Sequence, residues 1–154
     1  MTDFLLAALD EAFDARSWHG TNLRGSLRGL DVAVLSWRPG PDRHNIWELA
    51  VHAAYWKYAV RRKLTGEKRG SFALEGSNFW KRPVEKTTAA WKRDLALLDA
   101  EHLALRDAVA SFAETTWSRR PKGGRFTYAG MVRGVAAHDL YHAGQILLLK
   151  RLQQ

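Results

Sequence analysis

The clearest hydrophobic pattern in the sequence lies near its end, over residues 127–152. This stretch contains no proline, and its apolar residues recur every three or four positions, as on one face of an α-helix. The resulting stripe consists of Tyr128, Met131, Val135, His138, His142, Ile146 and Leu149. The pattern predicts an amphipathic helix, capped by Thr127, whose apolar face is interrupted at its centre by two histidines.

Four earlier segments show the same helical spacing. They cover residues 2–15, 22–37, 46–64 and 84–112. The third segment has the strongest boundaries, because Asn45 followed by Glu48 is typical of a helix start and Gly66 of a helix end. In the second segment, Gly25 and Gly29 lower the helix propensity.

No segment of useful length alternates apolar and polar residues as a β-strand does. Two irregular stretches, 69–83 and 118–125, separate the long helices, and the first is long enough to form a crossover or a lid. The sequence therefore predicts an all-α four-helix bundle, formed by a single domain over residues 1–154. The helix over 46–64 is apolar on both sides, so we expect the bundle core to cover one side and a subunit interface the other.

The composition is that of a globular protein, with 46% hydrophobic and 26% charged residues. The absence of cysteine excludes disulfides, zinc–thiolate sites and cysteine nucleophiles. There is no apolar run of about 18 residues and no pattern typical of a signal peptide, so we expect a cytoplasmic protein without a membrane partner. The net charge of +8 favours encounters with acidic molecules without identifying them.

Two histidines, His138 and His142, lie side by side on the last predicted helix, because residues four apart face the same way. Such a pair can share one metal ion. The alternative is two core imidazoles with separate hydrogen-bond partners. Helical bundles build metal sites from facing helices, and His52 on the helix over 46–64 can supply a third ligand. Three imidazoles would leave a coordination position open for water or substrate, as in catalytic metal sites.

Three further residues have roles that the sequence leaves open or restricts. Glu48 lies one turn before His52, where it can orient an imidazole, ligate metal, act as a general base or stabilise the helix start. His102 falls near the level of His138 if the last two helices are antiparallel, so it is a fourth ligand, a supporting group or a core residue. Asp139 stands where zinc proteases with an H-E-x-x-H motif have glutamate, which excludes that class.

Two motifs resemble the DinB/YfiT-like family of metal-dependent proteins. They are Ile46-Trp47-Glu48-Leu49-Ala50-Val51-His52, followed by Tyr55-Trp56, and His138-Asp139-Leu140-Tyr141-His142-Ala143-Gly144-Gln145-Ile146. The resemblance covers most of the chain and implies an up-down-down-up bundle that is commonly a homodimer. It also implies a divalent metal such as nickel or zinc, held by His52, His138 and His142. Relatives in the wider superfamily include isomerases and S-transferases that use low-molecular-weight thiols.

Two functions are compatible with these observations. The first is a metal-dependent thiol S-transferase or hydrolase, with a pocket near Tyr55, Trp56 and Tyr141 and a basic mouth for a small anionic thiol. The candidate mouth residues are Arg43, Arg119, Arg120 and Arg125. The alternative is a non-catalytic, metal-stabilised stress-response protein or a basic module that associates with nucleic acid. The chain has no helix-turn-helix, RNP motif or zinc finger, which argues against nucleic acid. A bundle with vestigial histidines is the third interpretation.

Overall fold

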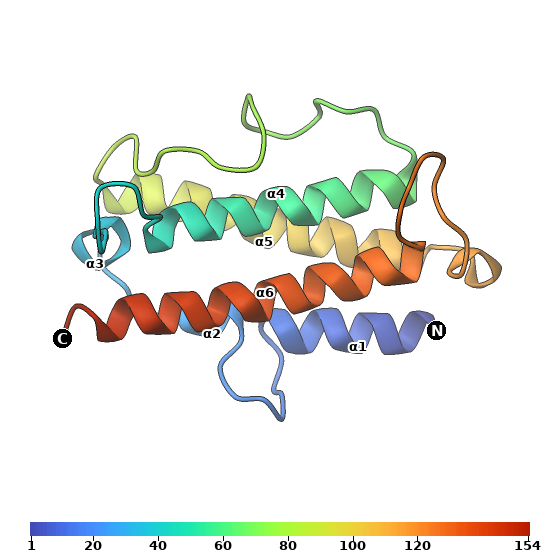
Figure 1. Ribbon diagram of the computed structural model, residues 1–154, viewed down its shortest axis with the longest axis horizontal. Helices are drawn as coiled ribbons and strands as arrows, with labels where there is room; N and C mark the ends of the chain where they lie inside the picture. The colour runs from blue at the N-terminus through green and yellow to red at the C-terminus, as the bar shows by residue number, and fades with distance from the viewer.

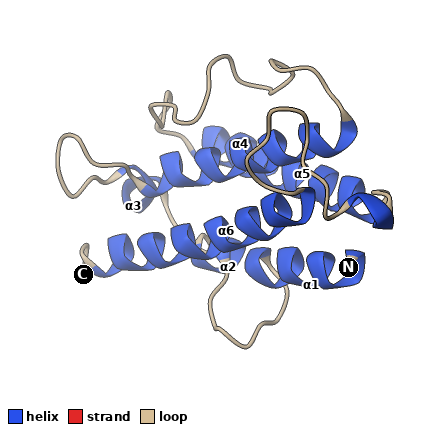
Figure 2. Ribbon diagram, turned by 45° about the vertical axis from the view of Figure 1, so that its right-hand side comes forward, coloured by secondary structure: helices blue, strands red, loops and turns tan.

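The computed structural model describes residues 1–154 and is entirely helical, which confirms the all-α class (Figures 1 and 2). Four helices are long, and two short ones lie in the connection between the first two long helices. The elements are α1 (Thr2–Phe13), α2 (Leu23–Ser26), α3 (Val32–Ser36), α4 (Ile46–Thr65), α5 (Thr88–Ala110), a 3-10 turn (Glu114–Thr116) and α6 (Tyr128–Arg151). None of them combines the length and the apolar character that crossing a membrane requires.

Helices α4 and α6 have the boundaries that the sequence predicts. The side-chain oxygen of Asn45 accepts a hydrogen bond from the Glu48 N–H at 2.8 Å, and the Thr127 hydroxyl accepts one from the Gly130 N–H at 3.0 Å. Gly66 ends α4 with a φ of +77°, a conformation that glycine adopts without strain. Local sequence therefore sets the ends of both helices that carry the candidate metal ligands.

The single helix expected over 22–37 is wrong, because the chain forms the separate helices α2 and α3 there. Gly29 lies between them with a φ of +71°, which a right-handed helix cannot include. Asp31 then starts a new helix by accepting a hydrogen bond from the Val34 N–H at 2.8 Å. The break turns the chain between α1 and α4.

The start of the helix expected over 84–112 is also wrong. The Thr87 hydroxyl accepts a hydrogen bond from the Ala90 N–H at 3.1 Å, so α5 begins only at Thr88. Val84, which the predicted apolar stripe included, is 78% exposed. The residues before the cap therefore belong to the connection between α4 and α5.

Helix α4 packs against both α5 and α6, and α1 packs against α6 and α5. In Figure 1, α4 and α5 run in one direction, whereas α1 and α6 run in the other. Hydrogen bonds from Trp47 to Asp94 and from Arg61 to Glu101 join successive levels of α4 and α5. Because these two helices are parallel, the connection between them must return along the bundle, and residues 66–87 form this crossover beside α4 (Figures 1 and 2).

The side of α4 that was expected to form a subunit interface is covered by the chain itself. The fully buried Trp47 packs edge-to-face against Trp91 of α5. The hydroxyl of Tyr58 accepts hydrogen bonds from the backbone N–H groups of Gly70 and Ser71 in the crossover, both at 3.1 Å. Residues that α4 turns away from α6 are therefore buried within one chain.

Two apolar clusters fill the bundle, and buried polar side chains lie between them. Along α6, Ala136 belongs to one cluster and Ile146 to the other, and the intervening turns carry polar residues. The buried polar side chains of this layer include His52, Lys57, Glu101, His102, Asp139 and His142. Buried polar groups need partners, so the contacts within this layer determine what the middle of the bundle can do.

Candidate metal centre

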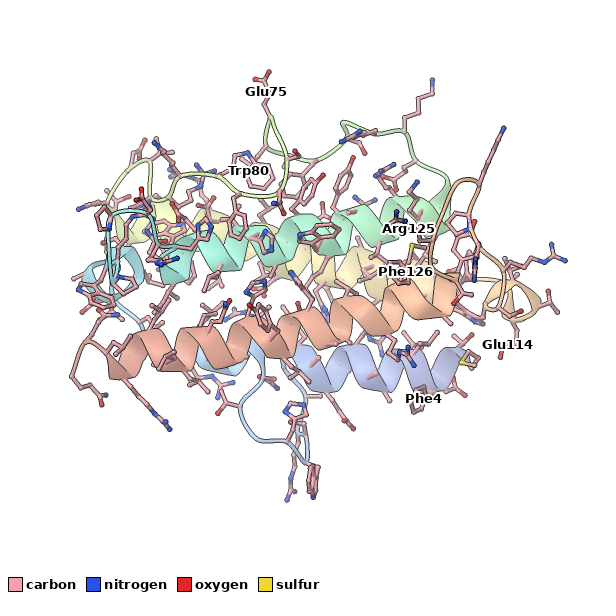
Figure 3. The ribbon with its side chains drawn as sticks, in the orientation of Figure 1. Phe4, Glu75, Trp80, Glu114, Arg125 and Phe126 are labelled. Carbon is pink, nitrogen blue, oxygen red and sulfur yellow. The ribbon has the colours of Figure 1, made fainter.

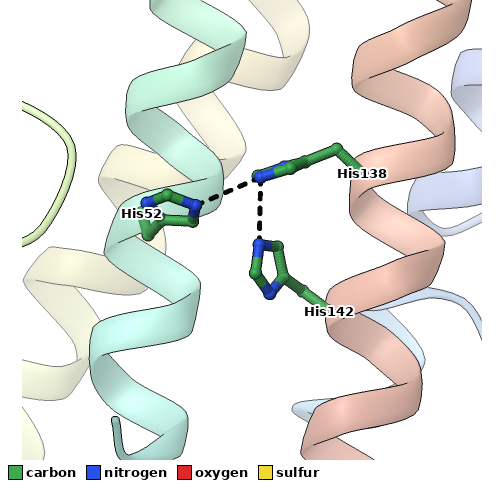
Figure 4. Close-up of side chains that lie close together, drawn as sticks. All are labelled: His52, His138 and His142. Atoms are coloured by element: carbon green, nitrogen blue, oxygen red, sulfur yellow. Dashed lines mark hydrogen bonds between the residues drawn. The ribbon is translucent and has the colours of Figure 1, made fainter.

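The three histidines predicted as ligands come together between α4 and α6. His52 projects from α4 towards His138 and His142 on α6, and one ring nitrogen of each lies within 4.8 Å of the others (Figure 4). The Nε2 atom of His138 is 3.1 Å from Nε2 of His52 and 3.0 Å from Nε2 of His142. No further histidine or carboxylate joins this group.

Hydrogen bonds at the far side of the rings orient two of these imidazoles. The Nδ1–H of His52 donates to the carbonyl of Asn78 at 2.7 Å, and that of His142 donates to the side-chain oxygen of Gln145 at 2.6 Å. The Gln145 amide is fixed in turn, because its NH₂ donates to the Tyr141 hydroxyl at 3.1 Å. A neutral imidazole carries one N–H, so the Nε2 atoms of both rings direct lone pairs towards His138.

Hydrogen bonds among the three rings cannot satisfy this arrangement. His138 can donate a single Nε2–H to one neighbour only, and its Nδ1 is buried without a partner. In a tetrahedral zinc site with Zn–N bonds of about 2.0–2.1 Å, ligand nitrogens lie roughly 3.3 Å apart. The observed separations of 3.0 and 3.1 Å are close to that value. The donor atoms and the two separations that involve His138 therefore suit a divalent cation, and the remaining pair of nitrogens lies within 4.8 Å.

Burial keeps the imidazoles in the form that binds metal. It lowers the pKa of His52 to about 4 and the pKa of His138 to about 3, and it also lowers the pKa of His142. Repulsion between the positively charged forms of neighbouring rings adds to the effect for His52 and His138. At neutral pH the three rings are therefore uncharged imidazoles, each with one N–H and one free lone pair, and can act as metal ligands.

The crossover supplies contacts to the site that the sequence did not reveal. Phe79 stacks against both His52 and His44, with ring centroids 3.8 Å apart in each case. Asn78 has a φ of +71°, and its side-chain oxygen accepts a hydrogen bond from the Trp56 indole at 3.1 Å. An irregular stretch carries no periodicity that would place it beside a helix, so only the fold reveals these partners.

Glu48 has partners of its own and does not join the histidine group. The Arg38 guanidinium forms a bidentate ion pair with the Glu48 carboxylate. The same carboxylate accepts hydrogen bonds from the His44 Nδ1–H at 3.0 Å and from the Arg82 backbone N–H at 3.1 Å. Burial raises the pKa of the Glu48 carboxyl, but these bonds outweigh it and hold the pKa below its usual value. The general-base role predicted for Glu48 stays a prediction, and its contacts tie the start of α4 to neighbouring loops.

His102 lies outside the histidine group, in the core between α1 and α5. Its ring stacks on Phe13 with centroids 3.8 Å apart, and its Nε2 is 3.8 Å from a carboxylate oxygen of Asp10. Burial, together with the charges of Lys57 and Arg106, lowers the pKa of His102 to about 3. Of the roles left open by the sequence, the structure supports that of a core residue.

We expect His102 to destabilise the fold in acid. Its pKa is about 3 in the folded chain but about 6.5 when unfolded, so between these values the unfolded chain binds the extra proton. The free energy of unfolding should fall by up to about 1.4 kcal/mol per pH unit below pH 6.5 because of this residue, and should be unaffected above that pH. Urea unfolding between pH 7 and pH 4 should show a shallower decline for His102→Gln. Equal declines would contradict the prediction.

Two hollows reach the histidines from different sides. The first, of about 510 Å³, is lined by all three histidines together with Pro39, Arg43, His44, Leu49, Phe79, Tyr141, Gln145, Leu148 and Leu149. The second, of about 650 Å³, shares His52 and His138 and continues past Tyr55 and Trp56. The mouth predicted from basic residues is correct for Arg43 only. Arg119, Arg120 and Arg125 are exposed residues of the connection before α6 and line neither hollow.

Comparison with known protein families finds a match. A family model described as the DinB superfamily matches residues 15–146, a span that includes all three histidines. No curated protein and no solved structure matches the chain. The match confirms the family that the two sequence motifs indicated.

Proposed function

This chain belongs to the DinB superfamily, and we propose that it is a divalent-metal-dependent enzyme whose ion is held by His52, His138 and His142. The observation that carries the proposal is the convergence of three Nε2 atoms, with that of His138 lying 3.1 Å from His52 and 3.0 Å from His142. The three rings have too few N–H groups on this side to satisfy one another by hydrogen bonds. The low pKa values of His52 and His138 support it, since they keep the rings neutral at pH 7. Nickel and zinc both suit imidazole ligands.

The reaction class that we propose is thiol S-transfer or hydrolysis. A divalent cation supplies Lewis-acid chemistry, which lowers the pKa of a water or a thiol that reaches it. The chain's own part is to hold the ligands, through the bonds from His52 to Asn78 and from His142 to Gln145. The first hollow gives a small thiol access to the histidines, and Arg43 in its lining can receive a carboxylate of that molecule. The homodimer and the cytoplasmic location stay predictions.

Metal content tests the proposed centre directly. Tag-free protein, dialysed with nickel or zinc and then freed of excess ion, should retain one equivalent of metal. The triple variant His52→Ala, His138→Ala, His142→Ala should retain none, because every proposed ligand is gone. His19→Ala is the matched control, since His19 is exposed and does not belong to the group. No uptake by the wild type, or equal uptake by the triple variant, would contradict the proposal.

Turnover separates the two functional interpretations. The metal-loaded protein should consume a low-molecular-weight thiol or hydrolyse a substrate, and the triple histidine variant should not. Stoichiometric metal binding with no reaction on a broad thiol and ester panel would favour the non-catalytic, metal-stabilised alternative.

A further inference from the structure

The second hollow has an apolar wall and a positively charged rim. Its wall includes Tyr55, Trp56, Val60, Phe126, Met131 and Val135. Its rim has three cationic residues, Arg62 and Lys63 near the end of α4 and Arg69 in the crossover. No aspartate or glutamate lines this hollow. Its chemistry is therefore that of a site for a molecule that is both apolar and anionic.

The three rim cations have no partners within the chain. The side chains of Arg62, Lys63 and Arg69 form no ion pair and no hydrogen bond, whereas neighbouring Arg61 pairs with Glu67 and Glu101. Unpaired cations gathered around one hollow attract an anion more strongly than the same charges spread over a surface. The rim is thus available to a carboxylate or a similar group.

The wall exposes large apolar side chains that a ligand would cover. Trp56 is 40% exposed and Phe126 is 68% exposed. Phe126 lies in the connection that enters α6, close to the end of α4 (Figure 3). Two glycines of α6, Gly130 and Gly134, also line the hollow, and a Cβ added at Gly134 would meet no atom within 4 Å. The missing side chains leave the groove between α4 and α6 open.

The separation of the rim from the histidines sets the length of such a ligand. Arg62 follows His52 by ten residues on α4, which corresponds to roughly 15 Å along the helix axis. Met131 precedes His138 by seven residues on α6, or about 10 Å. A molecule that contacts both ends of the hollow is therefore extended, and inorganic anions are too short.

We propose that the second hollow binds an extended organic carboxylate, with the carboxylate at Arg62, Lys63 and Arg69 and an alkyl or aryl body along the wall. Its far end then lies at His52 and His138, which line the inner end of the same hollow. Binding of the carboxylate does not require metal. If the three histidines hold a metal ion as proposed above, this far end is the part of the molecule that would react, and that part of the inference rests on the proposed function. The two hollows then give two different molecules access to one centre.

Calorimetric titration of metal-free protein with decanoate, kept below its micelle concentration, tests this site. One equivalent should bind, and decyltrimethylammonium, which has the same alkyl chain but the opposite charge, should bind at least tenfold more weakly. The triple variant Arg62→Gln, Lys63→Gln, Arg69→Gln should lose at least tenfold in affinity. The control Arg28→Gln, Lys86→Gln, Lys92→Gln removes the same charge from exposed residues outside the hollow and should bind normally.

A second variant tests the groove itself without lowering the charge. Gly134→Leu places a side chain into open space in the hollow, and replacing a helical glycine should not weaken α6. Decanoate binding should be lost while the circular dichroism spectrum is retained. Equal affinity for the cationic amphiphile, equal weakening in the control triple variant, or unchanged binding by Gly134→Leu would overturn the proposal. Because these titrations use metal-free protein, a failure of metal uptake would not affect their outcome.

Discussion

Lys57→Met is expected to lower the free energy of unfolding by about 3–5 kcal/mol. Lys57 on α4 forms an ion pair with Asp139 on α6, and both side chains are fully buried. The lysine ammonium also lies 4.8 Å from the centre of the Phe13 ring. Removing the lysine would leave the carboxylate without any partner, because the second oxygen of Asp139 already has none. Burial raises the pKa of Asp139, so the carboxylate of the variant can take up a proton. Protonation would remove the buried charge and so restore part of the lost stability.

Urea unfolding at pH 7 measures this loss, and two further variants show its origin. In Lys57→Met, Asp139→Val, no charge is left buried, so most of the lost stability should return. Arg24→Met removes the cation from a partly exposed ion pair with Asp99, whose side chains are 28% and 38% exposed, and should cost at most about 1 kcal/mol. A loss in Lys57→Met no greater than that in Arg24→Met would show that the buried pair contributes little.

The position of this ion pair connects stability to the candidate centre. Asp139 directly follows His138, and Lys57 lies on α4 little more than one turn beyond His52. The pair therefore holds α4 against α6 at the level where the three histidines meet. Specific spacing between the two helices is what brings Nε2 atoms from both to within 3.1 Å.

The residues of the candidate centre could be predicted because their signals are local. His138 and His142 are four residues apart on a helix with a clear cap at Thr127, and His52 lies on a helix with an equally clear cap at Asn45. The i, i+4 spacing fixes the first pair without any knowledge of the fold. Only the pairing of His52 with them required the assumption that α4 and α6 face each other.

Contacts made by irregular segments could not be predicted in the same way. Asn78 and Phe79 hold His52, but the crossover has no periodicity from which their positions could be inferred. At the level of sequence, Asp139 served only to exclude one class of zinc protease, and nothing in the sequence identified Lys57 as its partner. The predicted position of His102 relative to His138 depended on how the last two long helices align. A small error in that alignment changes the predicted role of His102 from metal ligand to core residue. These contacts depend on tertiary packing, which local spacing does not specify.

Metal binding is expected to raise the free energy of unfolding by about 2.7 kcal/mol at a free metal concentration one hundred times the Kd. For a chain of this length, that gain corresponds to an increase in Tm of roughly 5–11 °C. His138→Ala should abolish the increase. His138 is the ligand whose Nε2 lies within 3.1 Å of both other Nε2 atoms, so its loss leaves the remaining two rings without their common neighbour.

The quantity to compare is the shift in Tm on adding nickel or zinc, because His138→Ala also changes the packing of the metal-free chain. Wild type and the exposed-site control His19→Ala should show the same shift, and a chelator should reverse it in both. His44 lines the same hollow as the three histidines, hydrogen-bonded to Glu48 and stacked on Phe79, and is an alternative ligand. A full shift that persists in His138→Ala but disappears in His44→Ala would mean that the ion binds at the mouth of the first hollow. The three-histidine centre would then be wrong, even though the protein binds metal.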